Sequence, residues 1–97
     1  MKKSEMVRLK EMLEEAQIPH EVERPYGHDQ IIYPSREAWV SDAICHPGSF
    51  GYKEGLLEIM GLVDPDVGDE VEGWLRAEQV FEKWNKHWKK LQEEKGE

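Results

Sequence analysis

The sequence predicts an α+β fold of two layers, with an N-terminal helix and a C-terminal helix on one face of an antiparallel sheet of roughly three to five strands. Three features of the chain lead to this prediction. They are an amphipathic stripe near the N-terminus, short β-rich runs separated by glycine and proline, and a long helical stripe near the C-terminus. The 97 residues are expected to form a single domain, residues 1–97.

The first predicted helix covers residues 5–17. Ser4 precedes it, and a serine hydroxyl can accept a hydrogen bond from the free amides of the first turn. Pro19 ends it, because the proline ring disfavours the α conformation in the residue before it. Apolar side chains recur along this segment at spacings of three and four: Met6, Leu9, Leu13 and Ala16.

The middle of the chain alternates in the manner of short strands. Residues 20–24 and 30–33 are predicted to form a hairpin around a turn at 25–29. A third strand is predicted at 38–46, but both of its faces mix apolar and polar residues, so its inward face stays open. One face carries Val40, Asp42 and Ile44, and the other carries Trp39, Ser41, Ala43 and Cys45.

Residues 56–62 are compatible with a strand or a short helix, because the segment is short and Gly55 and Gly61 bracket it. We favour a strand that pairs antiparallel with residues 38–46. Residues 71–75 are expected to form a last short strand after an irregular acidic stretch that contains Pro65 and Gly68.

The C-terminal helix, predicted at 77–92, has the clearest pattern in the chain. Its apolar stripe consists of Val80, Phe81, Trp84, Trp88 and Leu91. Lysines gather in the same segment, and a basic, aromatic helix could bind single-stranded nucleic acid. Because Trp84 and Trp88 share the apolar stripe, we expect them to lie in the core instead.

The chain is strongly acidic, with 21 acidic and 13 basic side chains and a formal net charge of −8. This charge repels nucleic acid and anionic lipid, so we expect no direct binding to nucleic acid or membrane. The expected partner is a protein, and a basic one if charge attracts it. A homodimer would cover a sheet face that two thin layers leave open.

The single cysteine, Cys45, allows no internal disulfide. Residues 1–5 are followed by no apolar run, so we expect no signal peptide. No segment approaches the ~20 apolar residues of a membrane span. These features favour a cytoplasmic protein.

The motifs of catalysis and ligand binding are not found. The candidate metal ligands lack zinc-site spacing: His20, His28, His46, His87 and Cys45. Residues 64–75 do not match an EF-hand loop, and the glycines at 48, 51 and 55 lack the Gly-Lys-Ser/Thr of a phosphate loop. The sequence therefore predicts no catalytic residue, no cofactor and no metal site.

The best candidate for an interaction surface is the acidic stretch before the last helix, together with the tryptophan that follows it. Trp74 is the predicted exposed anchor, since indoles are common at binding hot spots. The predicted interaction surface consists of Asp64, Asp66, Asp69, Glu70, Glu72 and Trp74. The alternative is that these acids have no role in binding and only keep the protein soluble.

Residues 46–62 (HPGSFGYKEGLLEIMGL), 71–75 (VEGWL) and 77–81 (AEQVF) resemble small uncharacterised proteins encoded in phages and prophages of Gram-positive bacteria. Residues 16–21 resemble the same group more weakly. The resemblance implies an accessory protein in the cytoplasm of the bacterial host, and it transfers no catalytic residue. In that group a threonine stands where this chain has Arg76. Arginine cannot cap a helix, so capping of the last helix must come from elsewhere.

Three functions remain as hypotheses. The first is a non-enzymatic phage or prophage accessory protein that acts by protein–protein interaction. The second is an acidic nucleic-acid mimic that inhibits a host defence or DNA-binding protein, because spaced carboxylates can imitate phosphates. The third is a small metal-dependent enzyme with a site assembled across strands.

Overall fold

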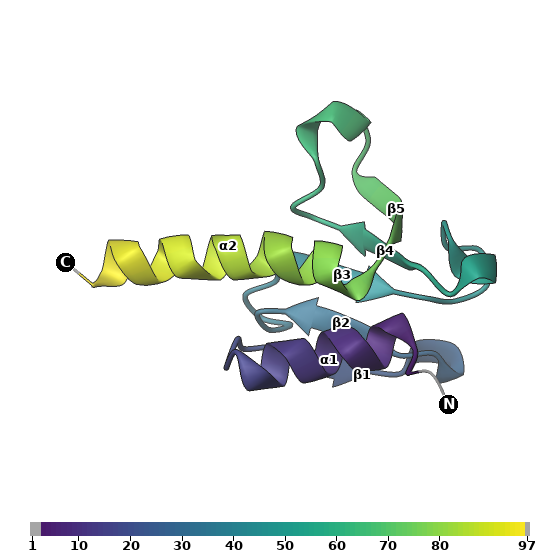
Figure 1. Cartoon of the computed structure of the whole chain (residues 1–97), viewed down its shortest axis with the longest axis horizontal. Coiled ribbons are helices and arrows are strands. Elements are labelled where there is room, and N and C mark those ends of the chain that lie inside the picture. The colour runs from purple at the N-terminus through teal and green to yellow at the C-terminus, as the bar shows by residue number, and fades with distance from the viewer. Residues whose placement is uncertain (1–2, 97) are drawn as a thin grey trace.

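The computed structural model describes residues 3–96 and confirms the predicted α+β arrangement (Figure 1). An N-terminal helix is followed by five strands and a C-terminal helix. The elements are α1 (Glu5–Glu15), β1 (Glu21–Glu23), β2 (Gln30–Tyr33), β3 (Ser41–Ile44), β4 (Leu57–Met60), β5 (Val71–Leu75) and α2 (Ala77–Lys95). Neither α-helix of the described residues combines the length and the apolar character that a bilayer crossing requires.

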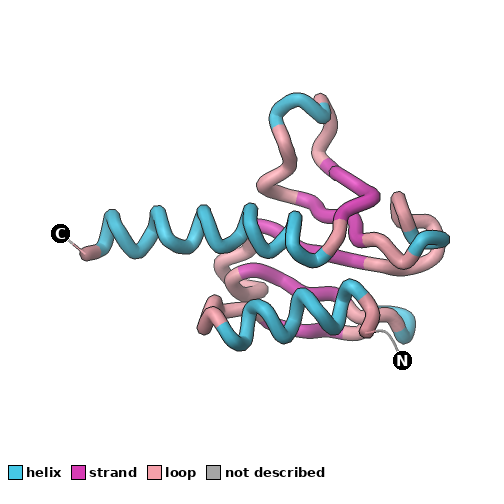
Figure 2. The backbone as a smooth tube through the Cα atoms, viewed as in Figure 1, coloured by secondary structure: helices cyan, strands magenta, loops and turns pink. Residues whose placement is uncertain are grey.

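The five strands form one antiparallel sheet in the order β1-β2-β3-β4-β5, so each strand pairs with its neighbour in the chain (Figure 2). The predicted hairpin is the β1–β2 pair. Residues 56–62, which were compatible with a strand or a short helix, contain the strand β4. As expected, β4 pairs with β3, and Ala43 lies opposite Ile59. The register shifts between Leu57 and Ile59, where β4 meets β5.

Four predicted elements are shorter in the structure, and one of them is the strand predicted at 56–62, which spans Leu57–Met60. The predicted strand at 38–46 spans only Ser41–Ile44, because Ser35 Oγ accepts from the Ala38 amide in a turn before it and Ser49 Oγ accepts from the His46 amide in a turn after it. The strand predicted at 20–24 spans Glu21–Glu23. The first helix ends at Glu15, where Gln17 takes a left-handed φ of 58°.

That helix end corrects the predicted stripe. Ala16 is exposed, and Ile18 takes its place in the core. The reason is local, since the Ile18 amide donates to the Leu13 carbonyl at 3.0 Å and folds the chain back over the helix end. At the other end Ser4 caps the helix as predicted, with its hydroxyl accepting from the Val7 amide at 3.1 Å.

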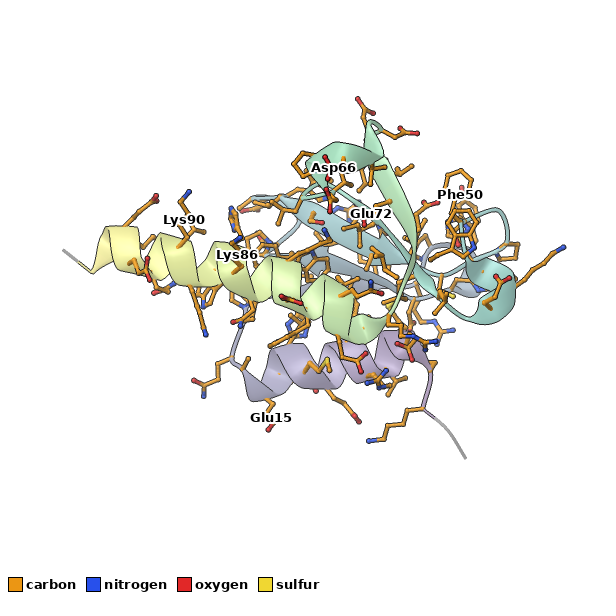
Figure 3. The ribbon with its side chains drawn as sticks, turned by 45° about the horizontal axis from the view of Figure 1, so that its top comes forward. Glu15, Phe50, Asp66, Glu72, Lys86 and Lys90 are labelled. Carbon is orange, nitrogen blue, oxygen red and sulfur yellow. The ribbon has the colours of Figure 1, made fainter. Side chains whose placement is uncertain are left out.

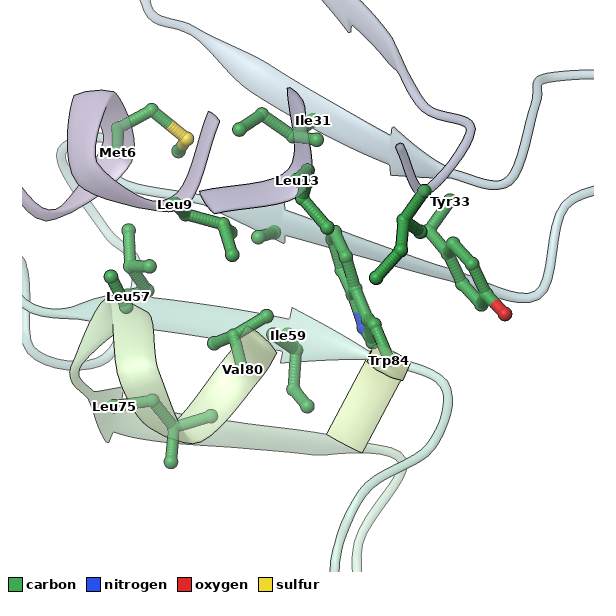
Figure 4. Packing of buried hydrophobic residues seen from close by; sticks show 13 residues of the cluster. Met6, Leu9, Leu13, Ile31, Tyr33, Leu57, Ile59, Leu75, Val80 and Trp84 are labelled. Carbon is green, nitrogen blue, oxygen red and sulfur yellow. The ribbon is translucent and has the colours of Figure 1, made fainter. Parts of the chain in front are cut away.

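Both helices lie on the same face of the sheet, and the hydrophobic core lies between the two layers (Figures 1 and 4). Trp84 is fully buried, as expected, and stacks on Tyr33 with ring centroids 5.3 Å apart. On β3 the inward residues are Ser41 and Ala43, which settles the question that the alternation left open. The buried Ser41 hydroxyl is satisfied by the Met60 carbonyl at 2.9 Å.

The N-termini of the two helices lie side by side, and α1 supplies a cap for α2. Glu5 Oε1 accepts from the Ala77 amide at 2.8 Å. Arg8 pairs with Glu5 at 2.9 Å and also with Glu78 on α2. The Ala77 amide is one of the first-turn donors that have no acceptor within the helix, and Glu5 satisfies it. Gln79 Oε1 also accepts from the Arg76 amide at 2.8 Å.

The change Glu5→Ala is expected to destabilise the protein by about 1–2 kcal/mol, because it removes the acceptor of the Ala77 amide and one carboxylate of Arg8. Urea denaturation would measure the loss of unfolding free energy. Glu14→Ala, on the exposed side of the same helix, is the control and should change the free energy by no more than about 0.5 kcal/mol. Equal effects of the two changes would contradict the role of Glu5.

Candidate functional site: the open face of the sheet

The face of the sheet turned away from the helices is the candidate site. Because side chains alternate along a strand, the residues next to the inward ones point to this second face. Its central residues are aligned by the register, with Gln30 opposite Ile44 and Ile44 opposite Glu58 in one row, and Ile32, Asp42 and Met60 in the next. We call this surface the open face. Met60 in its centre is 43% exposed.

The open face contains a concavity of about 620 Å³. Its floor comes from three strands: Gln30, Asp42, Ile44 and Met60. Its rim comes from the β1–β2 and β3–β4 connections: Pro25, Tyr26, His28, His46 and Pro47. The volume is within the range of roughly 300–1,000 Å³ typical of ligand pockets, and apolar walls with a few polar groups are characteristic of such sites.

Asp42 is the main charged group of the floor. Trp39 Nε1 donates to Asp42 Oδ2 at 2.8 Å. Burial raises the pKa of the Asp42 carboxyl, the hydrogen bond from Trp39 lowers it in part, and the nearby charge of Glu58 adds to the rise. None of the ion pairs found within residues 3–96 involves Asp42, so its negative charge has no cationic partner there.

Two histidines meet at the rim. The ring centroids of His28 and His46 are 6.4 Å apart, and His28 also packs edge-on against Tyr52 at 6.3 Å. Sequence reasoning treated these histidines separately and missed their approach. The strand register explains the approach. Because Gln30 pairs with Ile44 in an antiparallel pair, His28 and His46, each two positions beyond, also face one another.

A second feature stands at the β5 edge of this face, where Phe50 and Trp74 stack with ring centroids 5.3 Å apart and an interplanar angle of 22°. Both rings stay exposed, Phe50 at 48% and Trp74 at 56%. We call these two residues the aromatic pair. Figure 3 shows the Phe50 region on the side of the molecule away from the C-terminal half of α2.

The backbone holds the aromatic pair from several directions. The Trp74 amide donates to the Phe50 carbonyl at 3.2 Å, and the Phe50 amide donates to Glu58 Oε1 at 2.9 Å. Trp74 has a φ of 54°, which is uncommon for a residue with a side chain. A Cβ at Gly73 would lie 2.2 Å from Phe50 Cβ, so glycine is required there for Phe50 to approach.

The structure divides the predicted interaction surface into two parts. Four of its acids are exposed on the β4–β5 connection, which projects from the body (Figures 1 and 3): Asp64, Asp66, Asp69 and Glu70. Glu72 is half-buried and pairs with Lys83 on α2 at 3.3 Å. Trp74 is exposed, as expected, but its ring stacks on Phe50, at the far end of β5 from these acids.

Two of these acids accept hydrogen bonds from nearby backbone amides and so stabilise local turns. Asp64 Oδ1 accepts from the Asp66 amide at 2.9 Å and caps the short turn at Pro65–Val67. Asp69 Oδ1 accepts from the Glu70 amide. Carboxylates of this kind favour turns, because they offer an acceptor to a nearby backbone amide. Part of the acidity of the stretch therefore has a folding role.

The candidate metal ligands do not converge. Within residues 3–96 there is no group of three or more histidine, cysteine, aspartate or glutamate side chains that could hold an ion. His20 Nδ1 bonds the Ile18 carbonyl at 2.8 Å, and His87 Nδ1 bonds the Tyr33 hydroxyl at 2.7 Å. Cys45 packs against the core while His46 borders the open face, so the two point to opposite sides of the sheet.

Comparisons of the chain with protein-family models, with curated proteins and with solved structures find no match.

The change Asp42→Asn is expected to raise the unfolding midpoint at pH 7. Because the folded-state pKa of Asp42 is raised, the folded protein binds more protons than the unfolded chain between the two pKa values, and stability falls as pH rises through that interval. Asparagine has no such charge, and its carbonyl oxygen can still accept from Trp39.

Thermal unfolding over a range of pH would measure this effect. The advantage of Asp42→Asn should shrink as the pH falls below the ordinary aspartate pKa of about 3.9. Asp66→Asn, at an exposed position on the β4–β5 connection, is the control and should leave the midpoint unchanged at either end of the range. A less stable Asp42→Asn protein at pH 7 would show that the carboxylate stabilises the fold.

Proposed function

We propose that this chain is a non-enzymatic protein-binding module that contacts its partner through the open face and the aromatic pair. The observation that carries this proposal is the exposed stack of Phe50 and Trp74, held in place by backbone hydrogen bonds and a left-handed residue. Aromatic side chains dominate binding hot spots. A side chain that is already ordered loses little conformational entropy when a partner arrives.

The charge of the open face favours a partner with a basic contact surface. Asp42 and Glu58 lie on it, and the register places Glu21 and Glu23 of β1 at its border. A second copy docked face to face would bring these carboxylates together, and like charges oppose such a contact. A homodimer through this face is therefore less favoured than a basic partner protein.

A second candidate is an acidic mimic that occupies the nucleic-acid site of a host protein. It is supported by the exposed acids Asp64, Asp66, Asp69 and Glu70 on a connection that projects from the body. The internal hydrogen bonds of Asp64 and Asp69 weaken it. The proposed setting, carried by the resemblance described above, is a phage or prophage accessory protein in the cytoplasm of a bacterial host.

The first function is tested with peptides selected for binding to the intact protein from a random display library. Trp74→Ala is expected to weaken binding of the selected peptides by ~10-fold or more, which corresponds to about 1.4 kcal/mol of lost hot-spot contact. Isothermal titration calorimetry would measure the affinities, and circular dichroism would establish that the variant is folded.

Val7→Ala is the matched control, because Val7 is an exposed apolar residue on α1, on the helix side of the molecule. It should leave peptide affinity unchanged. Peptides that bind the Trp74→Ala protein as tightly as the original would exclude the aromatic pair as an anchor.

The two candidate functions differ in their response to salt. Binding through the exposed acids should weaken steeply as salt rises, since exposed charges are screened. Binding anchored by apolar rings should change little. The double change Asp66→Asn with Glu70→Gln, measured beside Trp74→Ala on the same selected peptides, separates them. A steep loss with salt together with a large effect of the double change would favour the mimic.

A further inference from the structure

We propose that the concavity of the open face is the subsite for one arginine side chain of the partner, with the guanidinium group against the Asp42 carboxylate. This inference rests on the proposed protein-binding function and deepens it by naming the group that the partner contributes. Three properties of the concavity support it: its uncompensated charge, the arrangement of its acceptors, and the character of its walls.

The charge is the first property. The Asp42 carboxylate is partly buried, none of the ion pairs in the described part of the chain involves it, and the negative charge of Glu58 lies nearby on the same face. A partly desolvated carboxylate gains more from a cation than an exposed one does, because the local dielectric constant is lower. A bound cation would relieve the unfavourable energy of this charge.

The acceptors are the second property. Trp39 Nε1 occupies one side of Asp42 Oδ2. The Gln30 side chain lines the same floor as Asp42 and helps to hold the pKa of the carboxyl down. An ionised carboxylate only accepts hydrogen bonds, and a side-chain amide can add its carbonyl oxygen as a further acceptor. A carboxylate beside a side-chain amide suits the planar fork of guanidinium donors better than the single point charge of lysine.

The walls are the third property. Ile44, Met60 and Pro47 offer apolar surface for the methylene stem of a long basic side chain. Tyr26 lines the concavity at its rim, and its side chain is fully exposed. A guanidinium plane can stack on such a ring. The concavity is large enough, at about 620 Å³, to admit neighbouring backbone of the partner as well.

A metal ion suits this place less well. A bound ion needs several oxygen or nitrogen ligands at short range, whereas the described residues contain no cluster of three such side chains. An anionic ligand would meet Asp42 and Glu58 with the wrong charge. An amine with a compact charge could reach Asp42, and lysine is therefore the competitor that the experiment must include.

The test uses small probes and the intact protein. N-acetyl-arginine-methylamide is titrated into the isotope-labelled chain, and amide chemical shifts are followed by NMR. The expected result is saturable shifts confined to the concavity, at residues 28–30, 42–46 and 58–60. The neutral isostere, N-acetyl-citrulline-methylamide, should bind ~10-fold more weakly or not at all, because it lacks the charge. The lysine probe should bind more weakly than arginine.

Asp42→Asn should abolish the arginine-dependent shifts. Loss of the fold cannot explain that result if the variant unfolds at an equal or higher temperature than the original. Asp66→Asn is the matched control and should keep arginine binding unchanged. Equal binding of the arginine and citrulline probes, equal binding of the lysine probe, or arginine shifts that survive Asp42→Asn would each overturn the inference.

The inference and the proposed function can fail separately. Trp74→Ala should leave binding of the small arginine probe unchanged, because Trp74 does not line the concavity. If the probe fails while selected peptides still depend on Trp74, the arginine subsite is wrong and the protein-binding function stands. If the probe binds while the peptides ignore Trp74, the aromatic anchor is wrong and the subsite stands.

Discussion

Burial of two apolar helix stripes against one face of a single sheet is the constraint on which the rest of this structure depends. The stripes of α1 and α2 both require cover, and four of the five strands, β2 to β5, supply buried apolar residues to the face beneath them. The fully buried Trp84 stacks on Tyr33 and so joins the second helix to the end of β2. Once both helices are on one side, the opposite side of the sheet is left for other contacts.

The two helices run in the same direction across the sheet, so their positive N-terminal ends meet (Figure 1). Adjacent dipole ends of like sign oppose one another, and carboxylates placed between them offset this repulsion. Glu5 accepts from the first amide of α2, and Arg8 links Glu5 to Glu78. The same contact satisfies one of the free amides in the first turn of α2. A residue near the start of the chain thereby orders a helix near its end.

The open face has features that do not serve stability. Asp42 is charged in a partly buried position without a cationic partner among the described residues. Phe50 and Trp74 expose large rings to water, and Trp74 adopts a backbone conformation that costs energy for a residue with a side chain. Features that lower the stability of the fold are common at binding sites, because function there requires groups that do not stabilise the free protein. Their position on one surface is the physical basis of the proposed binding function.

Local patterns in the chain were sufficient to predict the helices, most strand positions and the α+β class, because the 3.6-residue and two-residue periods are properties of neighbouring residues. The caps at Ser4 and the buried position of Trp84 follow from the same patterns. The inward face of β3, the approach of His28 to His46, the stack of Phe50 on Trp74 and the cap from Glu5 could not be predicted in this way. Each of these depends on strand register or on packing between residues far apart in the chain, and neither is encoded in any short segment.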